Sequence, residues 1–398
     1  AAENTAVGNS ALYAFTGSSA TAVGSGAADV AVSQTNLTAV GKNALGVATS
    51  GNSNTAVGAN SLQTVDGTQN TAVGTDALNA DCVSNNTAVG REALYAFTGS
   101  DATAVGSGAA DSAVGQTNLT AVGRLALSAA TSGNDNTAVG QGSLQTVDGA
   151  QNTAVGSGAL AADCVHSNTA VGYYALTAYT GSNATAVGDG AADAATAGDP
   201  TAIGQAALGA MTDGTENVAV GQLSFTTLTG GDHNTGVGSY SGWRTTGNRN
   251  TMLGNRAGIN ATTIDDCVAI GKNALAGDGS TAPTGNSNVA IGSYALDATT
   301  SAYGNIAIGH QAFSALAASS ESVAIGYLAG SATLDANNVY VGSQAGRYGT
   351  NVQDCVAIGT HAFKGDGTTA PTGDYNIAIG SYALDATTTG AKNIAIGY

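Results

Sequence analysis

The chain has 398 residues, of which 58 are glycine and only 9% are charged. Its formal net charge of −17 excludes a nucleic-acid-binding surface, which needs a basic face, and disfavours a direct grip on anionic membranes. No apolar run approaches the roughly 18 residues of a membrane-spanning helix, so we expect no direct membrane insertion of this segment.

The phrase Thr-Ala-Val-Gly recurs from one end of the chain to the other. The step between successive glycines is 16 or 17 residues, except for two steps of 21, and the phrase later becomes Val-Ala-Ile-Gly or Ile-Ala-Ile-Gly. A fixed short period of this kind indicates a solenoid, in which each turn packs only on its neighbours. We therefore predict an all-β solenoid of about 24 turns of 16–17 residues.

Each repeat reads Asn-[Thr/Val/Ile]-Ala-[Val/Ile]-Gly-x-x-Ala-[Leu/Phe] and continues with variable residues. Alternation along a strand places the two β-branched positions on one face and the alanine on the other. Because Thr, Val and Ile replace one another at the first position, we predict that the β-branched rows line the core, together with leucines such as Leu45. The alanine row is then predicted to face outward and to contact sister chains; the alternative is a tolerated surface alanine.

Three further positions of the repeat carry expectations. The recurring glycine is expected to adopt a left-handed or crowded turn conformation that a Cβ would disfavour. The two residues after it are expected to be exposed, because five of the ten basic residues occupy these slots. The leading asparagine is expected to bond backbone groups through its side chain and to stack into a ladder.

A longer repeat overlies the first. Residues 86–167 nearly copy residues 4–85 at a shift of 82, and residues 266–296 return at 354–384 at a shift of 88. We divide the chain into 1–204 with five-turn super-repeats, 205–270 with divergent transition turns, and 271–398 with the 88-residue super-repeat and two protruding 21-residue turns. Such copying favours a spacer whose length matters. Since the chain begins and stops in mid-repeat, we expect either that it is part of something longer or that it associates end to end.

No catalytic, cofactor or metal constellation is found, so we expect no enzyme. The four histidines are isolated, and the Gly-Asp-Gly segments at 277–279 and 365–367 lack the other ligands of a calcium loop. A carbohydrate-cleaving solenoid would need clustered carboxylates on one face. The four cysteines lie several turns apart, too far for intrachain disulfides, and are expected to be buried or lone thiols, an interchain bond being the alternative: Cys82, Cys164, Cys267 and Cys355.

The most divergent turn, residues 238–256, holds the single tryptophan and three of the ten basic residues. Aromatic faces beside guanidinium groups can stack on a sugar or hold an acidic glycan. The alternative, which we favour, is a structural transition in which glycine replaces leucine at Gly242 and Gly258 and bulky side chains fill a changed core. The candidate binding residues are Tyr240, Trp243, Arg244, Arg249 and Arg256.

The threonine row also raises ice binding, which requires a flat, exposed and regular threonine array. Valine and isoleucine replace threonine at the same position in later turns. Such exchange suits a core rather than an ice-binding surface, so this function ranks low.

Repeats such as Asn-Val-Ala-Ile-Gly-Ser-Tyr-Ala at 288–295 resemble the head repeats of YadA-like trimeric autotransporter adhesins. They are also similar to repeats of bacteriophage and prophage tail fibres. The resemblance covers essentially the whole chain and implies a left-handed parallel β-roll, a homotrimer around a common axis, and a place outside the cell on a cell or virion surface. The stalk, neck and anchor of the adhesins and the chaperone domain of many tail fibres are missing from the match.

The resemblance implies a non-enzymatic structural and adhesive segment of a surface fibre, whose partners are its own copies and a host-surface glycan or protein. The alternative is the shaft of a bacteriophage tail fibre that positions a receptor-binding tip. The missing domains leave the ligand unspecified.

Overall fold

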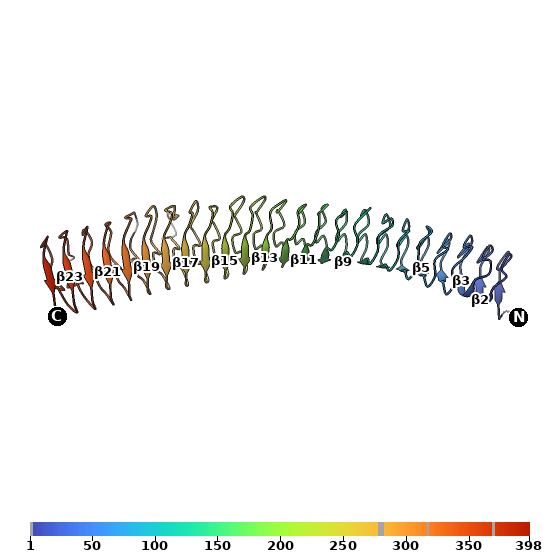
Figure 1. The fold of residues 1–398 in the computed structure, drawn as a ribbon, viewed down its shortest axis with the longest axis horizontal. Helices are drawn as coiled ribbons and strands as arrows, with labels where there is room; N and C mark the ends of the chain where they lie inside the picture. Colours follow the sequence, from blue (N-terminus) through green and yellow to red (C-terminus); the bar gives the residue numbers. More distant parts are fainter. Residues whose placement is uncertain (1–2, 278–281, 317, 368–370) are drawn as a thin grey trace. The chain divides into compact units, whose positions relative to one another are not determined.

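The computed structural model describes residues 3–277, 282–316, 318–367 and 371–398. Within these residues the chain is all-β, with 24 short strands and no helix (Figure 1). The chain divides into two compact units, a first unit of residues 1–197 and a second unit of residues 198–398. The three segments expected from repeat identity, with boundaries at 204/205 and 270/271, follow sequence likeness and stay a prediction.

The first unit contains twelve strands, one for each turn. All but two are three residues long, because the glycine that follows ends each strand. The strands are β1 Thr5–Val7, β2 Ser18–Val23, β3 Thr35–Val40, β4 Thr55–Val57, β5 Thr71–Val73, β6 Thr87–Val89, β7 Thr103–Val105, β8 Thr120–Val122, β9 Thr137–Val139, β10 Thr153–Val155, β11 Thr169–Val171 and β12 Thr185–Val187.

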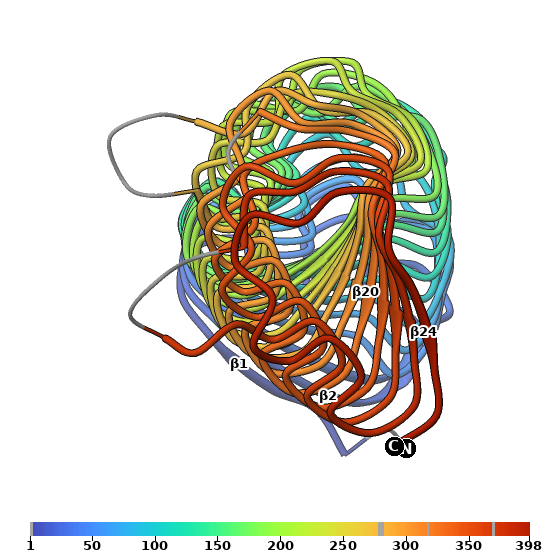
Figure 2. The ribbon, with the colours of Figure 1, turned by 90° about the vertical axis from the view of Figure 1, so that its left-hand side faces the viewer.

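The second unit also contains twelve strands among its described residues. In Figure 2, β20 and β24 lie along the same side of the coil. The strands are β13 Thr201–Ile203, β14 Val218–Val220, β15 Thr235–Val237, β16 Thr251–Leu253, β17 Val268–Ile270, β18 Val289–Ile291, β19 Ile306–Ile308, β20 Val323–Ile325, β21 Val339–Val341, β22 Val356–Ile358, β23 Ile377–Ile379 and β24 Ile394–Ile396.

Within each unit, every strand pairs in parallel with the next strand along the chain. The register places each residue on its counterpart one turn later, as with Thr153 and Thr169 in the first unit and Ile306 and Val323 in the second. The fold is therefore a parallel β-solenoid of about 23 turns, and the predicted repeat architecture is confirmed.

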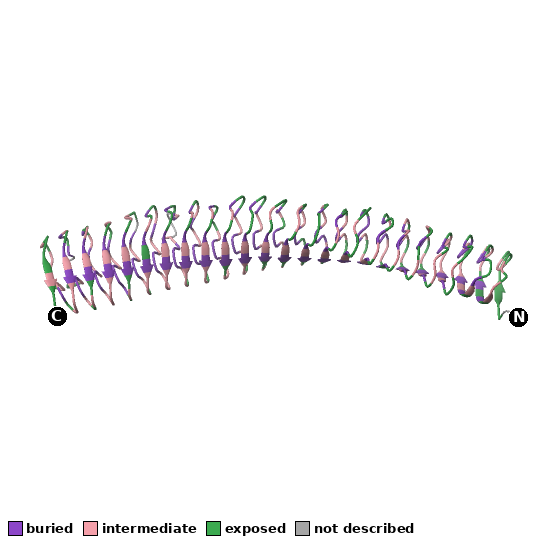
Figure 3. Ribbon diagram, in the orientation of Figure 1, coloured by how far each residue is buried: buried purple, intermediate pink, exposed green. Residues whose placement is uncertain are grey.

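The predicted orientation of the strands is wrong. The middle alanine of the strands is buried, with 0% of its surface exposed at Ala138 and at Ala290, whereas the flanking Val155 and Ile325 are each 38% exposed. Figure 3 shows this buried band passing through the middle of the strands. The alanine row therefore faces the interior, and the threonine, valine and isoleucine rows face outward.

The physical reason is the volume available inside each turn. Leucine or phenylalanine four residues after the strand glycine fills the interior from the opposite wall, as the fully buried Leu144 and Phe313 do. Little more than a methyl group then fits on the strand side, since protein interiors are close-packed. The predicted contribution of these leucines to the core is confirmed.

Three exceptions support this account, because each pairs a changed strand residue with a compensating change across the interior. Where Met252 replaces alanine, the position across the interior that holds leucine in other turns is Gly258. A Cβ at Gly258 would lie 2.5 Å from the Met252 sulfur. Where Tyr340 replaces alanine, a Cβ at Gly346 would lie 2.6 Å from its ring. Conversely, Gly236 on the strand makes room for Phe225.

The expectation for the glycine row is confirmed, whereas that for the exposed slots is confirmed only in part: the second residue after the glycine is half-buried in many turns, as at Asn60 and Glu92. The strand glycines have φ between +124° and +144°, and a Cβ at Gly140 would lie 2.4 Å from the carbonyl oxygen of Gly156 in the next turn. Lys42 and Arg124, which directly follow such glycines, are exposed.

The asparagine ladder is also confirmed. Asn152 is fully buried; its backbone N–H donates to Oδ1 of Asn136 at 2.9 Å, and its Nδ2 donates to the carbonyl of Val165 at 3.2 Å. Its own Oδ1 accepts from the N–H of Asn168, one turn later, at 3.0 Å. Each asparagine thus satisfies buried backbone groups of two neighbouring turns.

Cys267 occupies an asparagine position of this ladder, and its thiol forms weaker hydrogen bonds there than an asparagine amide would. Its N–H donates to Asn250 as an asparagine would, but its sulfur stands 3.5 Å from both the Gly285 carbonyl and the Asn288 N–H. Because amide groups form stronger hydrogen bonds than a thiol, we expect Cys267→Asn to stabilise the second unit by about 1 kcal/mol. Urea denaturation checks this value; a loss of stability would show that the site is shaped for sulfur.

All four cysteines are free and buried, as expected. Burial raises the pKa of Cys82 to about 12 and those of Cys164 and Cys267 to about 11, from an ordinary value of 9.0, and it also raises the pKa of Cys355. Because the thiolate is the reactive form, a rise of two pKa units lowers its fraction near neutral pH about a hundredfold.

We therefore expect Ellman's reagent to modify none of the four thiols rapidly in the folded protein, and all four after denaturation. A single fast thiol in the native protein would contradict the burial of that cysteine.

Residues 278–281 and 368–370 of the two 21-residue repeats lie outside the described residues, so the predicted protrusion and the Gly-Asp-Gly calcium alternative are not tested there. In the described ranges no helix is long and apolar enough to cross a membrane. The same ranges contain no group of three or more His, Cys, Asp or Glu side chains placed to hold a metal ion.

Candidate functional site

The predicted site residues lie in the turns that follow β15 and β16. Tyr240 and Arg256 each stand two residues after a strand glycine, and Trp243 stands five residues after one. Tyr240 and Arg256 donate their backbone N–H groups to the preceding turn, at Gln222 and Ser239, so the second positions of successive turns stack into a column. We call the second and fifth positions after the strand glycine the second and fifth columns.

Two of the predicted residues, Tyr240 and Arg244, lie against the indole ring of a third, Trp243. The ring centroids of Tyr240 and Trp243 are 6.1 Å apart in an edge-to-face arrangement, and the guanidinium carbon of Arg244 lies 4.8 Å from the Trp243 ring centroid. Aromatic pairs favour this edge-to-face geometry, and a cation over an indole face is attracted by the ring quadrupole. The local sequence therefore holds Trp243 in a defined position at the surface of the turn.

A hollow of about 320 Å³ opens beside Trp243. Arg256 lines it from the second column of the next turn, so three of the predicted residues, Tyr240, Arg244 and Arg256, lie around the fourth, Trp243. Sequence reasoning missed the other side chains of the hollow, although they occupy the same two columns or the position after the fifth. The lining residues are Trp243, Arg256, Ile259, Asn260, Asn273, Ala276 and Gly277.

Arg249, the fifth predicted residue, is not part of this hollow. It lies just before β16, where its Nε and one terminal nitrogen donate to the Asp266 carboxylate at 2.6 and 2.9 Å. This bidentate pair lowers the pKa of Asp266 and raises that of Arg249. His233 and Glu216 occupy the equivalent positions one and two turns earlier, and their side chains are 3.1 Å apart. Arg249 therefore belongs to a charged ridge beside the strands.

The structural transition expected in this segment is present beneath the hollow. Phe225 fills the space in front of Gly236 and Gly242, and Met252 fills the space in front of Gly258. Packing therefore explains the inward-facing residues of these turns, but it does not explain the outward-facing Trp243. The structural-transition interpretation applies to the inner face of these turns, and the binding-site interpretation applies to their outer face.

The described lining of the hollow carries groups that can hold a ligand. It offers an indole ring, one guanidinium group and two amides, and none of these described residues has a carboxylate, thiol or imidazole. An indole and a guanidinium together can contact the apolar face and the carboxylate of an acidic sugar.

A column of aromatic rings, not recognised as such from the sequence, follows further along the second unit. Ring centroids are 6.3 Å apart between Tyr294 and His310 and 5.6 Å apart between His310 and Tyr327, and the Lys272 ammonium lies 5.9 Å from the Tyr294 ring.

Comparison of the chain with protein-family models and with curated proteins finds no match.

Proposed function

We propose that the chain is a non-enzymatic structural and adhesive segment of an extracellular fibre built from three copies of the chain. The observation that carries the proposal is the outward orientation of the β-branched rows. In every strand the two residues that flank the middle position are threonine, valine, isoleucine or leucine, although the chain carries 27 acidic residues elsewhere. Beside the threonines, valine, isoleucine and leucine form an uncharged apolar row in every strand, and a long apolar row on a sheet is typical of a surface that a partner covers.

The partner that fits such a stripe is another copy of the chain. The rows repeat at the spacing of neighbouring β-strands, about 4.8 Å. A partner must keep the same spacing over many turns to fill the gaps between these side chains, and a second copy in the same register has that spacing by construction. Copies arranged around an axis parallel to the stack place equivalent turns at equal height. The number three and a left-handed coil follow the resemblance to YadA-like adhesins and tail fibres.

This arrangement reverses the interface expected from the sequence. The β-branched rows, and not the alanine row, would meet at the common axis. Burial of valine and isoleucine contributes about 25 cal/mol per Å² of apolar surface, so a stripe that continues over many turns would stabilise the assembly strongly.

The experiment that tests the proposal is a mass measurement in solution. Size-exclusion chromatography with light scattering is expected to give three times the chain mass of 38.2 kDa. A monomer at micromolar concentration would overturn the proposal. Sequence beyond this chain would separate an adhesin from a tail fibre, since an anchor barrel supports the first and a chaperone or baseplate-joining segment supports the second.

Ice binding is the second candidate, because the structure removes the reason for ranking it low. All twelve strands of the first unit begin their Thr-Ala-Val segment with a threonine that faces outward in a regular row. This function requires the strand face to be free, whereas a trimer covers it. A monomer that shows thermal hysteresis would support ice binding and contradict the trimer.

For the adhesive role we propose the Trp243 hollow as a site for an acidic glycan. Trp243→Ala is expected to weaken binding of an acidic oligosaccharide about tenfold, because it removes the ring that contacts the sugar face. Binding to a glycan array, followed by titration calorimetry with the best acidic ligand, measures the change. Arg249→Ala is the control, since it removes a positive charge outside the hollow and is expected to leave binding unchanged. A loss as large as that of Trp243→Ala would show that binding does not depend on the hollow in particular.

A further inference from the structure

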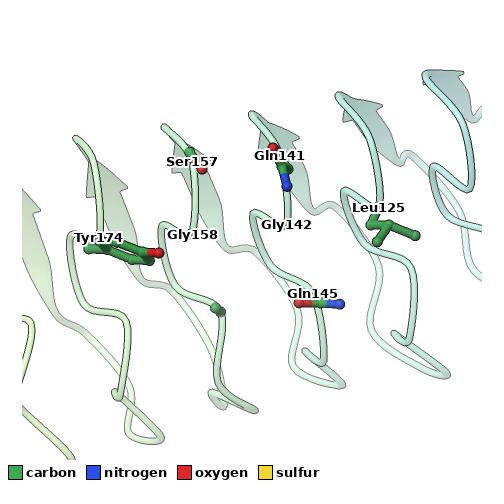
Figure 4. A pocket seen from close by; sticks show the side chains of 8 residues that line it. Leu125, Gln141, Gly142, Gln145, Ser157, Gly158 and Tyr174 are labelled. Atoms are coloured by element: carbon green, nitrogen blue, oxygen red, sulfur yellow. The ribbon is translucent and has the colours of Figure 1, made fainter.

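A second hollow lies between the same two columns in the first unit, where sequence analysis predicts no site. Its volume is about 220 Å³, and Figure 4 shows it open between Leu125 and Tyr174. The side chains come from four successive turns. They are Leu125, Gln141, Gly142, Gln145, Ser157, Gly158, Ala161 and Tyr174.

Comparison with the first copy of the 82-residue super-repeat shows how the hollow arises. Gly142 and Gly158 correspond to Asn60 and Asp76 in that copy. There the second column is filled, because Asn43 donates to Asn60 at 3.3 Å and Asn60 donates to Asp76 at 3.0 Å. In the second copy Leu125 also replaces Asn43, so none of the three ladder residues is kept, and the two glycines leave an opening.

The walls of the opening are apolar in part. The Tyr174 ring extends back over Gly158, where a Cβ would lie 2.5 Å from the ring, and its hydroxyl end points along the column (Figure 4). The Leu125 side chain extends over Gly108, in the direction away from Gly142. A Cβ at Gly108 would lie 2.9 Å from a methyl group of Leu125. The space above Gly142 therefore stays open between a phenol and a leucine.

The rims of the opening carry amides and a hydroxyl. Gln141 and Ser157 stand on one side of Gly142 and Gln145 stands on the other (Figure 4). Within the part of the chain that the structure describes, neither glutamine amide is engaged in a hydrogen bond. Each amide can therefore both donate and accept toward a ligand.

We infer that this hollow binds a single neutral sugar ring. A pyranose combines apolar C–H faces with hydroxyl groups that donate and accept, which matches a tyrosine ring, a leucine, two amides and a serine. None of the eight lining residues is charged, so the lining offers no partner for an anionic or cationic ligand. The volume lies below the roughly 300–1,000 Å³ of sites for drug-sized ligands, which fits one ring.

The inference does not depend on the fibre proposed above. The hollow belongs to the turn columns, whereas the proposed assembly uses the strand rows, so sugar binding and oligomeric mass are separate measurements. It also differs from the Trp243 hollow, which contains a guanidinium group and is proposed for an acidic glycan.

The test is titration of the full chain, in whatever assembly it forms, with glucose, galactose, mannose and N-acetylglucosamine by saturation-transfer NMR. At least one sugar is expected to bind with a Kd of about 1–10 mM. Gly142→Asn is expected to abolish this binding by refilling the column. It should fold normally, because the backbone at Gly142 has φ +62° and Asn60 adopts φ +56° at the equivalent position.

Two further variants make the test specific. Tyr174→Asn, which removes the ring but keeps a residue type already present in this column, is expected to weaken binding about tenfold. Gly190→Asn is the matched control: it stands in the same column at φ +59°, outside the hollow, and is expected to bind like the wild type. Binding of none of the four sugars, or unchanged binding by Gly142→Asn, would overturn the inference.

Discussion

Replacement of Gly140 by alanine is expected to destabilise the first unit by about 3 kcal/mol or more. Two effects add. The backbone at Gly140 has φ +136°, a region that side chains other than hydrogen rarely adopt, and a Cβ there would lie 2.4 Å from the Gly156 carbonyl oxygen. That oxygen belongs to the backbone of the next turn, so it cannot move away without breaking the stack. Urea denaturation followed by circular dichroism measures the loss.

Gly142→Ala provides the control for this prediction within the same turn. Its φ of +62° also disfavours alanine, by about 1–2 kcal/mol, but a Cβ there would meet only the Gln145 side chain, at 3.6 Å. The difference between the two variants therefore isolates the close approach of neighbouring turns. Equal losses would mean that the glycine row is required only for its backbone angles.

Much of the fold could be predicted from the repeat alone. A glycine every 16 or 17 residues indicates stacked turns, and glycine and asparagine each have a strong positional preference with a physical cause. These preferences are local, which is why the positive φ of Gly140 and the ladder bonds of Asn152 match the expectation.

The orientation of the strands could not be obtained in the same way. Alternation defines two faces but does not say which one is inside, and exchange among Thr, Val and Ile is tolerated both in a core and in a contact surface. The deciding signal was present at the exceptions to the alanine row. Met252 and Tyr340 coincide with glycine in place of the facing leucine, at Gly258 and Gly346, and such compensation occurs only between residues that share one interior.

The candidate site was predicted in part for a related reason. Tyr240, Trp243, Arg244 and Arg256 meet around one indole because their positions in the repeat bring them to neighbouring columns. Arg249 is near them in sequence, but its position places it on the ridge before the strand, against Asp266. In a solenoid, position within the repeat decides proximity more than distance along the chain.

The double substitution Ile325→Glu and Ile358→Glu is expected to weaken self-association of the proposed trimer at least about a hundredfold, because like charges meeting in a desolvated interface cost several kcal/mol. Both side chains face outward, 38% and 39% exposed, so each chain should keep its fold. Sedimentation velocity over a range of concentrations measures the shift from trimer to monomer, and circular dichroism reports the fold.

Two substitutions in the turn of Ile358 separate assembly from folding. Ala357→Glu, one residue earlier and fully buried, is expected to unfold the second unit, because it places a charge in an interior that holds only a methyl group. Thr360→Glu, in the exposed slot after Gly359, is expected to change neither fold nor mass. A double variant that sediments like the wild type would show that the β-branched rows are not the interface. Dissociation caused by Thr360→Glu would place the interface on the turns.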